Sequence, residues 1–191
     1  ARDQIERYWR WFKDGHLSGT GQPGEAHASP DVAKALATFR WRGLPVAGSH
    51  DPKDAAATSL PRVLAAALFA GNDPAAAIAL AAECARTTHQ SPVVLDACRV
   101  YSAMLLCALG GRPAQDWLRA VPEPVPGCWT ARPLRKDVQA VVATASVAGD
   151  TSVARGAIDV VQALALARRI TGDAQDFDAA IAAAKHSAHH D

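Results

Sequence analysis

Helix-starting and helix-ending residues recur along this alanine-rich chain, and they constrain its fold more than any other feature. Ser29-Pro30, Asp73-Pro74 and Ser91-Pro92 each place a capping residue before a proline. A proline suits the first turn of a helix, because its missing N–H would have no partner inside the helix there. Gly15 and Gly43 stand where helices are expected to stop. Because alanine also has the highest intrinsic helix propensity, the chain is predicted to be all-α.

The spacing of apolar side chains agrees with these signals and predicts eight or nine helices. The expected segments are 2–14, 30–42, 61–70, 74–87, 92–109, and about 133–147, 153–170 and 174–187. Asp173 is a plausible cap for the last segment. The stretch VQAVVATASV would pass locally as a strand, but its neighbours favour a helix. Residues 15–29 and 121–133 are rich in glycine or proline and are expected to be irregular.

Length and charge narrow the classes of protein that this chain can belong to. A chain of 191 residues is long enough to bury a sizeable core, so residues 1–191 are expected to form a single domain. The net charge is +1 and the basic residues are scattered, so no nucleic acid partner is expected. No apolar run reaches the roughly 20 residues that cross a bilayer, and no secretory leader is recognisable. A cytoplasmic protein without a membrane partner is therefore expected.

The cysteines also favour a cytoplasmic protein. Cys84, Cys98, Cys107 and Cys128 form no CxxC pair, and three of them lie in apolar helical patterns. Buried, reduced thiols are the expected state. A zinc site or a disulfide is the alternative.

Three internal segments carry more polar chemistry than a packed helical domain needs. The glycine-rich loop 18–29 is either a phosphate-binding loop or a plain connection, and its spacing matches no phosphate-binding motif. Thr58 and Ser59 precede a helix, so Ser59 is either its N-cap or a ligand-binding hydroxyl. The turn Thr87-Thr88-His89 ends a helix, where a histidine either interacts with the helix dipole or faces a ligand.

The C-terminal stretch KHSAHHD, residues 185–191, is a fourth candidate. His186 shares a helical face with His189 or His190, and Asp191 follows, so these side chains could bind a metal. The segment is terminal, where fraying is common, so the histidines could also be adventitious.

Read in order, several stretches resemble the ADP-ribosylglycohydrolase family, and its dinitrogenase reductase-activating glycohydrolase branch most closely. The similar stretches are RYWRWFKDGHLSGTG (7–21), KALATFRWRGLPVAGS (34–49) and SLPRVLAAALFAGNDPAAAIALAAECARTTHQSPVVLDACRVYSAMLLCALGG (59–111). The specific part is the order of a Ser-Leu-x-Arg loop, an alanine-rich helix, an Arg-Thr-Thr-His turn and a helix with Asp-Ala-Cys-Arg. Weaker similarity continues through GAIDVVQALALARR and FDAAIAAAKHSAHHD, so the resemblance spans nearly the whole chain.

The resemblance implies a compact, orthogonal multi-helix domain of the ADP-ribosylglycohydrolase type. It implies a hydrolase that cleaves the glycosidic bond between ADP-ribose and a protein side chain or small molecule. The partner would be an ADP-ribosylated protein or a small-molecule ADP-ribose conjugate, and a pair of magnesium ions would assist. Carried onto this chain, the ADP-ribose pocket is lined by Thr58, Ser59 and His89.

The chain also departs from the family's pattern. The first metal motif, Thr-Asp-Asp, does not occur, and the loop Asn-Gly-Ser-Leu-Met-Arg reads Ala-Thr-Ser-Leu-Pro-Arg at residues 57–62. The second metal motif of the family aligns with His189 and Asp191. A histidine nitrogen, however, is a poor replacement for the oxygen ligand that magnesium prefers. The domain is therefore expected to be incomplete at both metal motifs, and no catalytic residue is assigned. A catalytically degenerate member that binds ADP-ribose or a protein is the alternative.

Overall fold

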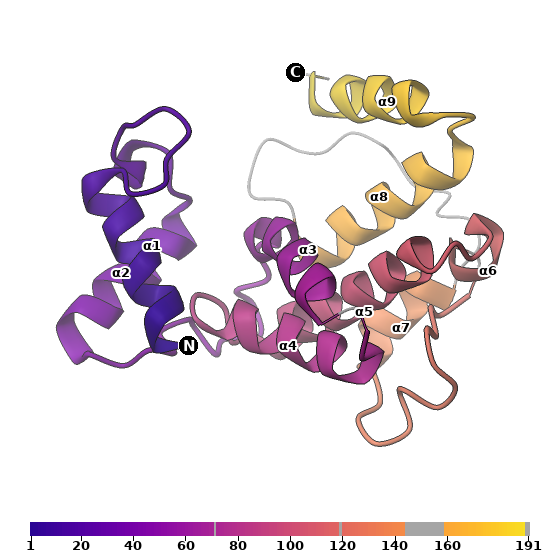
Figure 1. Cartoon of the computed structure of the whole chain (residues 1–191), viewed down its shortest axis with the longest axis horizontal. Helices are drawn as coiled ribbons and strands as arrows, with labels where there is room; N and C mark the ends of the chain where they lie inside the picture. The colour runs from indigo at the N-terminus through magenta and orange to yellow at the C-terminus, as the bar shows by residue number, and fades with distance from the viewer. Residues whose placement is uncertain (71, 119, 144–158, 190–191) are drawn as a thin grey trace.

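The computed structural model describes residues 1–70, 72–118, 120–143 and 159–189 of the chain (Figure 1). Within these ranges the structure is helical, and no named strand occurs. The α-helices are α1 (Arg2–Asp14), α2 (Pro30–Arg42), α3 (Leu60–Phe69), α4 (Pro74–Arg86), α5 (Pro92–Leu109), α6 (Ala114–Leu118), α7 (Lys136–Ala143), α8 (Val160–Asp173) and α9 (Phe177–His189). Two short 3₁₀ helices, η1 (Gly24–Ala26) and η2 (Ala57–Ser59), precede α2 and α3. The predicted all-α class is confirmed.

The local signals located the first five helices to within about a residue. Helices α2, α4 and α5 begin at Pro30, Pro74 and Pro92, as predicted. Helices α1 and α2 end in left-handed glycines at Gly15 and Gly43. Glycine adopts this conformation without the steric penalty that a Cβ atom imposes.

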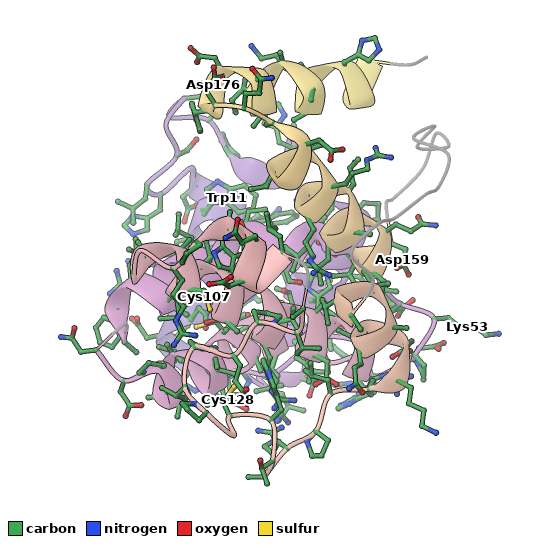
Figure 2. All side chains as sticks on the ribbon, turned by 90° about the vertical axis from the view of Figure 1, so that its right-hand side faces the viewer. Trp11, Lys53, Cys107, Cys128, Asp159 and Asp176 are labelled. Atoms are coloured by element: carbon green, nitrogen blue, oxygen red, sulfur yellow. The ribbon has the colours of Figure 1, made fainter. Side chains whose placement is uncertain are left out.

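The caps of the last helices differ from the prediction. Asp173 is wrong as a cap, because it is the last residue of α8. The cap is Asp176, whose side chain accepts a hydrogen bond of 2.7 Å from the N–H of Ala179 in the first turn of α9. Asp159 caps α8 by accepting from the N–H of Val161 at 2.8 Å. Figure 2 shows both aspartates at the N-terminal ends of their helices.

The remaining boundaries differ from those expected by several residues, most of all at α8, which begins at Val160 instead of 153. Helix α7 covers part of the expected 133–147 segment, and residues 144–147 and 153–158 lie outside the described ranges. The short helix α6 was not predicted, since five residues are too few to show a helical period. Residues 121–133 are irregular, as their prolines predicted.

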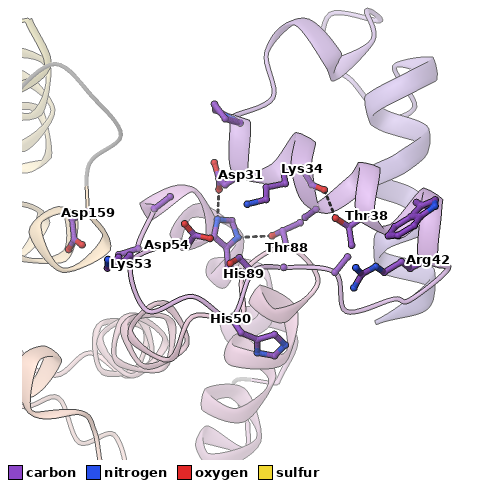
Figure 3. A pocket seen from close by; sticks show the side chains of 18 residues that line it. Asp31, Lys34, Thr38, Arg42, His50, Lys53, Asp54, Thr88, His89 and Asp159 are labelled. Carbon is purple, nitrogen blue, oxygen red and sulfur yellow. Dashed lines mark hydrogen bonds and ion pairs between the residues drawn. The ribbon is translucent and has the colours of Figure 1, made fainter.

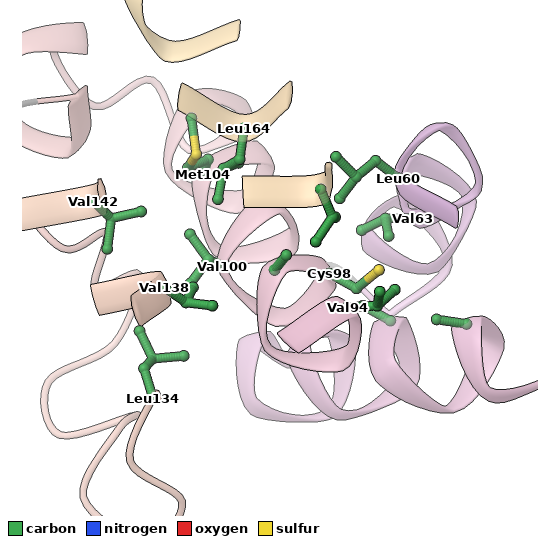
Figure 4. Packing of buried hydrophobic residues seen from close by; sticks show 14 of the residues in the cluster. Leu60, Val63, Val94, Cys98, Val100, Met104, Leu134, Val138, Val142 and Leu164 are labelled. Atoms are coloured by element: carbon green, nitrogen blue, oxygen red, sulfur yellow. The ribbon is translucent and has the colours of Figure 1, made fainter. Parts of the chain in front are cut away.

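Helix α5 is the centre of the main hydrophobic core. It contacts α3, α4, α6, α7 and α8, and its residues Val94, Cys98 and Val100 are completely buried (Figure 4). Over its 18 residues the mean hydropathy is 1.6, enough by length and composition alone to cross a membrane. However, 67% of this stretch is buried among the other helices, as in the core helix of a folded domain.

A second, smaller cluster joins α1 to α2. It contains Ile5 and Phe12 from α1 and Leu36 and Phe39 from α2. Figure 1 shows these two helices on one side of the molecule and the helices from α3 onward on the other. The loop between α2 and α3 connects the two parts.

All four cysteines are free thiols, and the predicted burial holds for two of them. Cys98 and Cys107 are buried in α5, whereas Cys84 and Cys128 are partly exposed. Burial raises the pKa of Cys98 to about 11, although a contact with Ser59 opposes the shift. The environment of Cys98 is therefore that of a structural thiol rather than a nucleophile.

Candidate functional site

A seam of backbone hydrogen bonds joins the loop after α2 to the turn after α4. The N–H of Ala47 donates to the carbonyl of Thr87 at 3.2 Å, and the N–H of Gln90 donates to the carbonyl of Ser49 at 3.0 Å. Between them, Ser49 and His89 form an isolated parallel bridge. The seam ties the α1–α2 part of the chain to the main core.

Gly48 allows the two segments of the seam to approach this closely. A Cβ atom at this position would lie 2.3 Å from the backbone nitrogen of His89. The atoms that it would meet are backbone atoms of Thr88 and His89, which cannot move aside as the end of a flexible side chain can. The seam therefore requires glycine here for close approach, without any positive φ.

The turn after α4 is polar and yet buried. Thr87, Thr88, His89, Gln90 and Ser91 are at most 8% exposed. The Thr87 hydroxyl donates to the carbonyl of Cys84 at 2.9 Å, and the Gln90 amide donates to the carbonyl of Gly48 at 2.8 Å. Burial of polar groups is costly unless they are hydrogen-bonded, and these contacts meet that requirement for Thr87 and Gln90. The buried hydroxyl of Ser91, in contrast, has no hydrogen-bond partner among the described residues.

His89 is held from both sides of its ring. Its Nδ1 lies 2.8 Å from Thr88 Oγ1 and 3.3 Å from an Arg62 guanidinium nitrogen. Its Nε2 contacts the carboxylate of Asp31 and lies 3.0 Å from Thr58 Oγ1 (Figure 3). Because a guanidinium can only donate, Arg62 favours the tautomer in which Nδ1 accepts and the proton sits on Nε2, directed at Asp31.

Asp31 is the partner of His89 that sequence reasoning missed. It lies in the first turn of α2, where an acidic residue is accounted for by the helix dipole alone. Thr58 Oγ1 donates to it at 2.5 Å. Burial works against ionisation of Asp31, but hydrogen bonds from His89, Thr58 and Ser29 outweigh it and hold the pKa of this carboxyl well below its usual range.

Of the three residues predicted to bind ADP-ribose, the structure brings Thr58 and His89 together and places Ser59 elsewhere. Ser59 occupies the N-cap position of α3 but makes no capping hydrogen bond. Its side chain is 1% exposed and lies 3.4 Å from the sulfur of Cys98 in the core. Arg62, from the same loop, donates to Thr88 Oγ1 at 2.6 Å and stacks over the ring of Tyr8.

A cavity of about 770 Å³ opens beside His89. One wall is a face of α2, and the other is formed by residues 47–50 and 53–56. Thr88, His89 and Asp159 complete the lining (Figure 3). This size and this mixture of polar and apolar groups are typical of small-molecule sites.

The glycine-rich loop does not line this cavity. Ser18 and Thr20 bond to each other at 3.0 Å in an exposed turn. A Cβ atom at Gly24 would lie 2.4 Å from the Trp11 ring, so this glycine lets the loop pack on α1. Of the two interpretations of the loop, these contacts favour a connection.

The described residues do not form a magnesium site on their own. They contain no group of three or more His, Cys, Asp or Glu side chains placed to hold a metal ion. Asp31, Asp54 and Asp159 line the cavity, but Asp31 already accepts from Thr58 and His89, and Asp159 caps α8. His189 is the last residue of α9, and its side chain lies outside the described part, as does Asp191. The metal assignment of these two residues stays a prediction.

Comparison with known families identifies the class of protein to which this chain belongs. The family model for ADP-ribosylglycohydrolase matches residues 1–189. The chain therefore belongs to the ADP-ribosylglycohydrolase family, as its motifs indicated. No curated protein and no solved structure gives a significant match.

Proposed function

We propose that this chain binds ADP-ribose conjugates in the cavity beside His89 and hydrolyses their glycosidic bond. The observation that carries the proposal is the buried imidazole of His89 at the cavity, in a chain of this family. Its ring is only 4% exposed and has polar partners on both nitrogens. A side chain held in this way loses little further conformational entropy when a ligand binds.

The side chains that line the cavity complement the phosphate and ribose groups of ADP-ribose. Lys34 and Lys53 are cationic and could bind phosphate oxygens. Asp31 is held in its ionised form and could accept hydrogen bonds from ribose hydroxyls. The same low pKa makes Asp31 a poor proton donor, so we assign it to binding and not to protonation of the leaving group.

Magnesium dependence belongs to the proposal because the family resemblance implies it. The described residues contain no group of three or more side chains placed to hold a metal ion, so the assignment of the metal ligands awaits His189 and Asp191. The substrate would be an ADP-ribosylated protein or a small-molecule ADP-ribose conjugate.

A binding module without catalysis is the second candidate. Two of the three cavity carboxylates, Asp31 and Asp159, already accept hydrogen bonds from their own chain. A carboxylate that is engaged in this way has fewer lone pairs free for a metal ion or for an attacking water, which favours binding without bond cleavage.

Calorimetry with ADP-ribose tests the proposed site. We expect the full chain to bind ADP-ribose and His89→Ala to weaken binding about tenfold, because the Asp31 carboxylate at the cavity would lose a hydrogen-bond partner, and such a loss costs about 1–3 kcal/mol. His89→Gln, which keeps a polar side chain, checks that a loss does not reflect unfolding. His27→Ala is the matched control, because His27 is exposed and lies outside the cavity. Unchanged affinity in both His89 variants would contradict the assignment.

The same preparation separates the hydrolase from the binding module. The full chain is incubated with ADP-ribosyl-arginine, with and without magnesium, and free ADP-ribose is measured. Magnesium-dependent release supports the hydrolase. Binding of ADP-ribose without release of product favours the binding module.

A further inference from the structure

One face of α2 forms a continuous wall of the cavity. Asp31, Lys34, Thr38, Trp41 and Arg42 all line it. Their spacing of three or four residues places them in one stripe along the helix. From Asp31 to Trp41 the helix rises about 15 Å, at about 1.5 Å per residue. The cavity wall is therefore elongated, with the Asp31–His89 contact at one end.

The chemistry of this wall changes along its length. The Asp31 end is hydrogen-bonded to His89 and Thr58. Lys34 follows one turn later, and Figure 3 shows its side chain beside this contact. Within the described residues Lys34 forms no ion pair, so its charge is available to a ligand.

The far end of the wall is aromatic. Trp41 is 79% exposed, which is unusual for the largest apolar side chain. The guanidinium of Arg42 lies 4.9 Å from the centre of its ring. An exposed indole beside a guanidinium offers a flat surface on which a heteroaromatic ring can stack.

We propose that this face of α2 binds the adenosine diphosphate part of the ligand, with the base stacked on Trp41 and Arg42 and the phosphates near Lys34. The inference rests on the proposed binding of ADP-ribose. An extended ADP-ribose carries a sugar, a diphosphate and a base in that order, and the wall offers polar, cationic and aromatic groups in the same order. Ser59 is buried against Cys98, and Arg62 lies against Thr88 and Tyr8, so neither lines the cavity. Helix α2 provides the recognition surface instead.

Calorimetry with ADP-ribose on Trp41 variants of the full chain tests this assignment. Base stacking on an aromatic side chain contributes about 1–3 kcal/mol, so Trp41→Ala is expected to weaken binding at least about fivefold. Trp41→Phe keeps an aromatic ring and is expected to restore most of the affinity. Phe69→Ala is the control, because Phe69 is 87% exposed but does not line the cavity.

Lys34→Ala supplies an independent measurement. It is expected to weaken ADP-ribose binding about threefold or more and to reduce its dependence on salt, since a charge-assisted contact to phosphate is lost. Lys136→Ala removes an exposed lysine outside the cavity and is expected to change nothing.

The outcomes distinguish this inference from the proposed function. Wild-type affinity in Trp41→Ala, while His89→Ala binds weakly, overturns the α2 assignment alone. Equal losses in Trp41→Ala and Trp41→Phe also overturn it, because stacking would then not be the cause. A wild-type chain that does not bind ADP-ribose overturns both.

Discussion

Donors from two other parts of the chain hold the Asp31 carboxylate at the edge of the cavity. Thr58 lies before α3 and His89 after α4, yet both contact the same carboxylate. Since Asp31 is only 26% exposed, water screens these contacts less than it would at the open surface. At the scale of single residues, the hydrogen bonds to Asp31 therefore both shape the edge of the cavity and stabilise the fold.

The low pKa of Asp31 predicts how its contribution to stability depends on pH. The folded-state value lies below the unfolded value of about 3.9, so the contribution is fully present above that value and is lost as the pH falls toward the folded pKa. Asp31→Asn is expected to lower the free energy of unfolding by about 1–3 kcal/mol at pH 7. The difference from wild type should shrink at pH 3.

Urea unfolding at both pH values measures this effect. Asp14→Asn is the control, because Asp14 is exposed at the end of α1 and the change should stay within about 0.5 kcal/mol. A difference between Asp31→Asn and wild type that is equally large at pH 3 and pH 7 would show that the carboxylate charge is not responsible.

At the scale of elements, the seam between residues 47–49 and 87–90 positions His89. The imidazole reaches Asp31 and Thr58 only because its backbone is fixed against Ser49. The seam depends on a residue without a side chain, Gly48. Its packing can therefore be tested without touching any polar group of the site.

Gly48→Ala is expected to lower the free energy of unfolding by about 1–3 kcal/mol, the usual cost of forcing an extra methyl group into a packed region. It should also weaken ADP-ribose binding, because the backbone of His89 would have to shift. Chemical denaturation and calorimetry measure the two effects. Gly19→Ala serves as the comparison, since a Cβ atom there would meet nothing within 4 Å. Equal stability of the two variants would argue against a close-packed seam.

The helix boundaries show which features of the fold local sequence signals can predict. The Ser-Pro and Asp-Pro pairs located three helix starts because a proline restricts its own backbone wherever it stands. The caps Asp159 and Asp176 could not be chosen in advance, because aspartates recur near these boundaries and a cap contributes only about 1 kcal/mol. The packing of α8 against α5 contributes more free energy than a single cap, so packing decides where the helix begins.

At the scale of the whole molecule, α8 closes the main core. Leu164 is 1% exposed and belongs to the same cluster as Met104 of α5 and Val138 of α7 (Figure 4). These three side chains come from distant parts of the sequence. Their packing joins the C-terminal helices to the rest of the fold.

Leu164→Ala is expected to lower the free energy of unfolding by about 2–5 kcal/mol, the range for removing a large aliphatic side chain from a core. Thermal and urea unfolding measure it. Leu68→Ala removes the same atoms from an α3 side chain that is 60% exposed, and should cost much less. Similar losses in both variants would mean that α8 does not close the core.

The sequence by itself determined the helical class, the starts of α2, α4 and α5, and the family to which the chain belongs. These depend on local propensity and on ordered motifs, which need no knowledge of long-range contacts. His89 and Thr58 also became candidates in this way, through resemblance to the family.

Only the tertiary structure decided which residues share the cavity. Asp31 and His89 are separated by 58 positions, and no spacing in the sequence predicts that they meet. The same holds for the α2 wall that ends at Trp41, and for the burial of Ser59 against Cys98. Long-range contacts depend on how helices pack, and packing energy is summed over many side chains, so no single local pattern determines it.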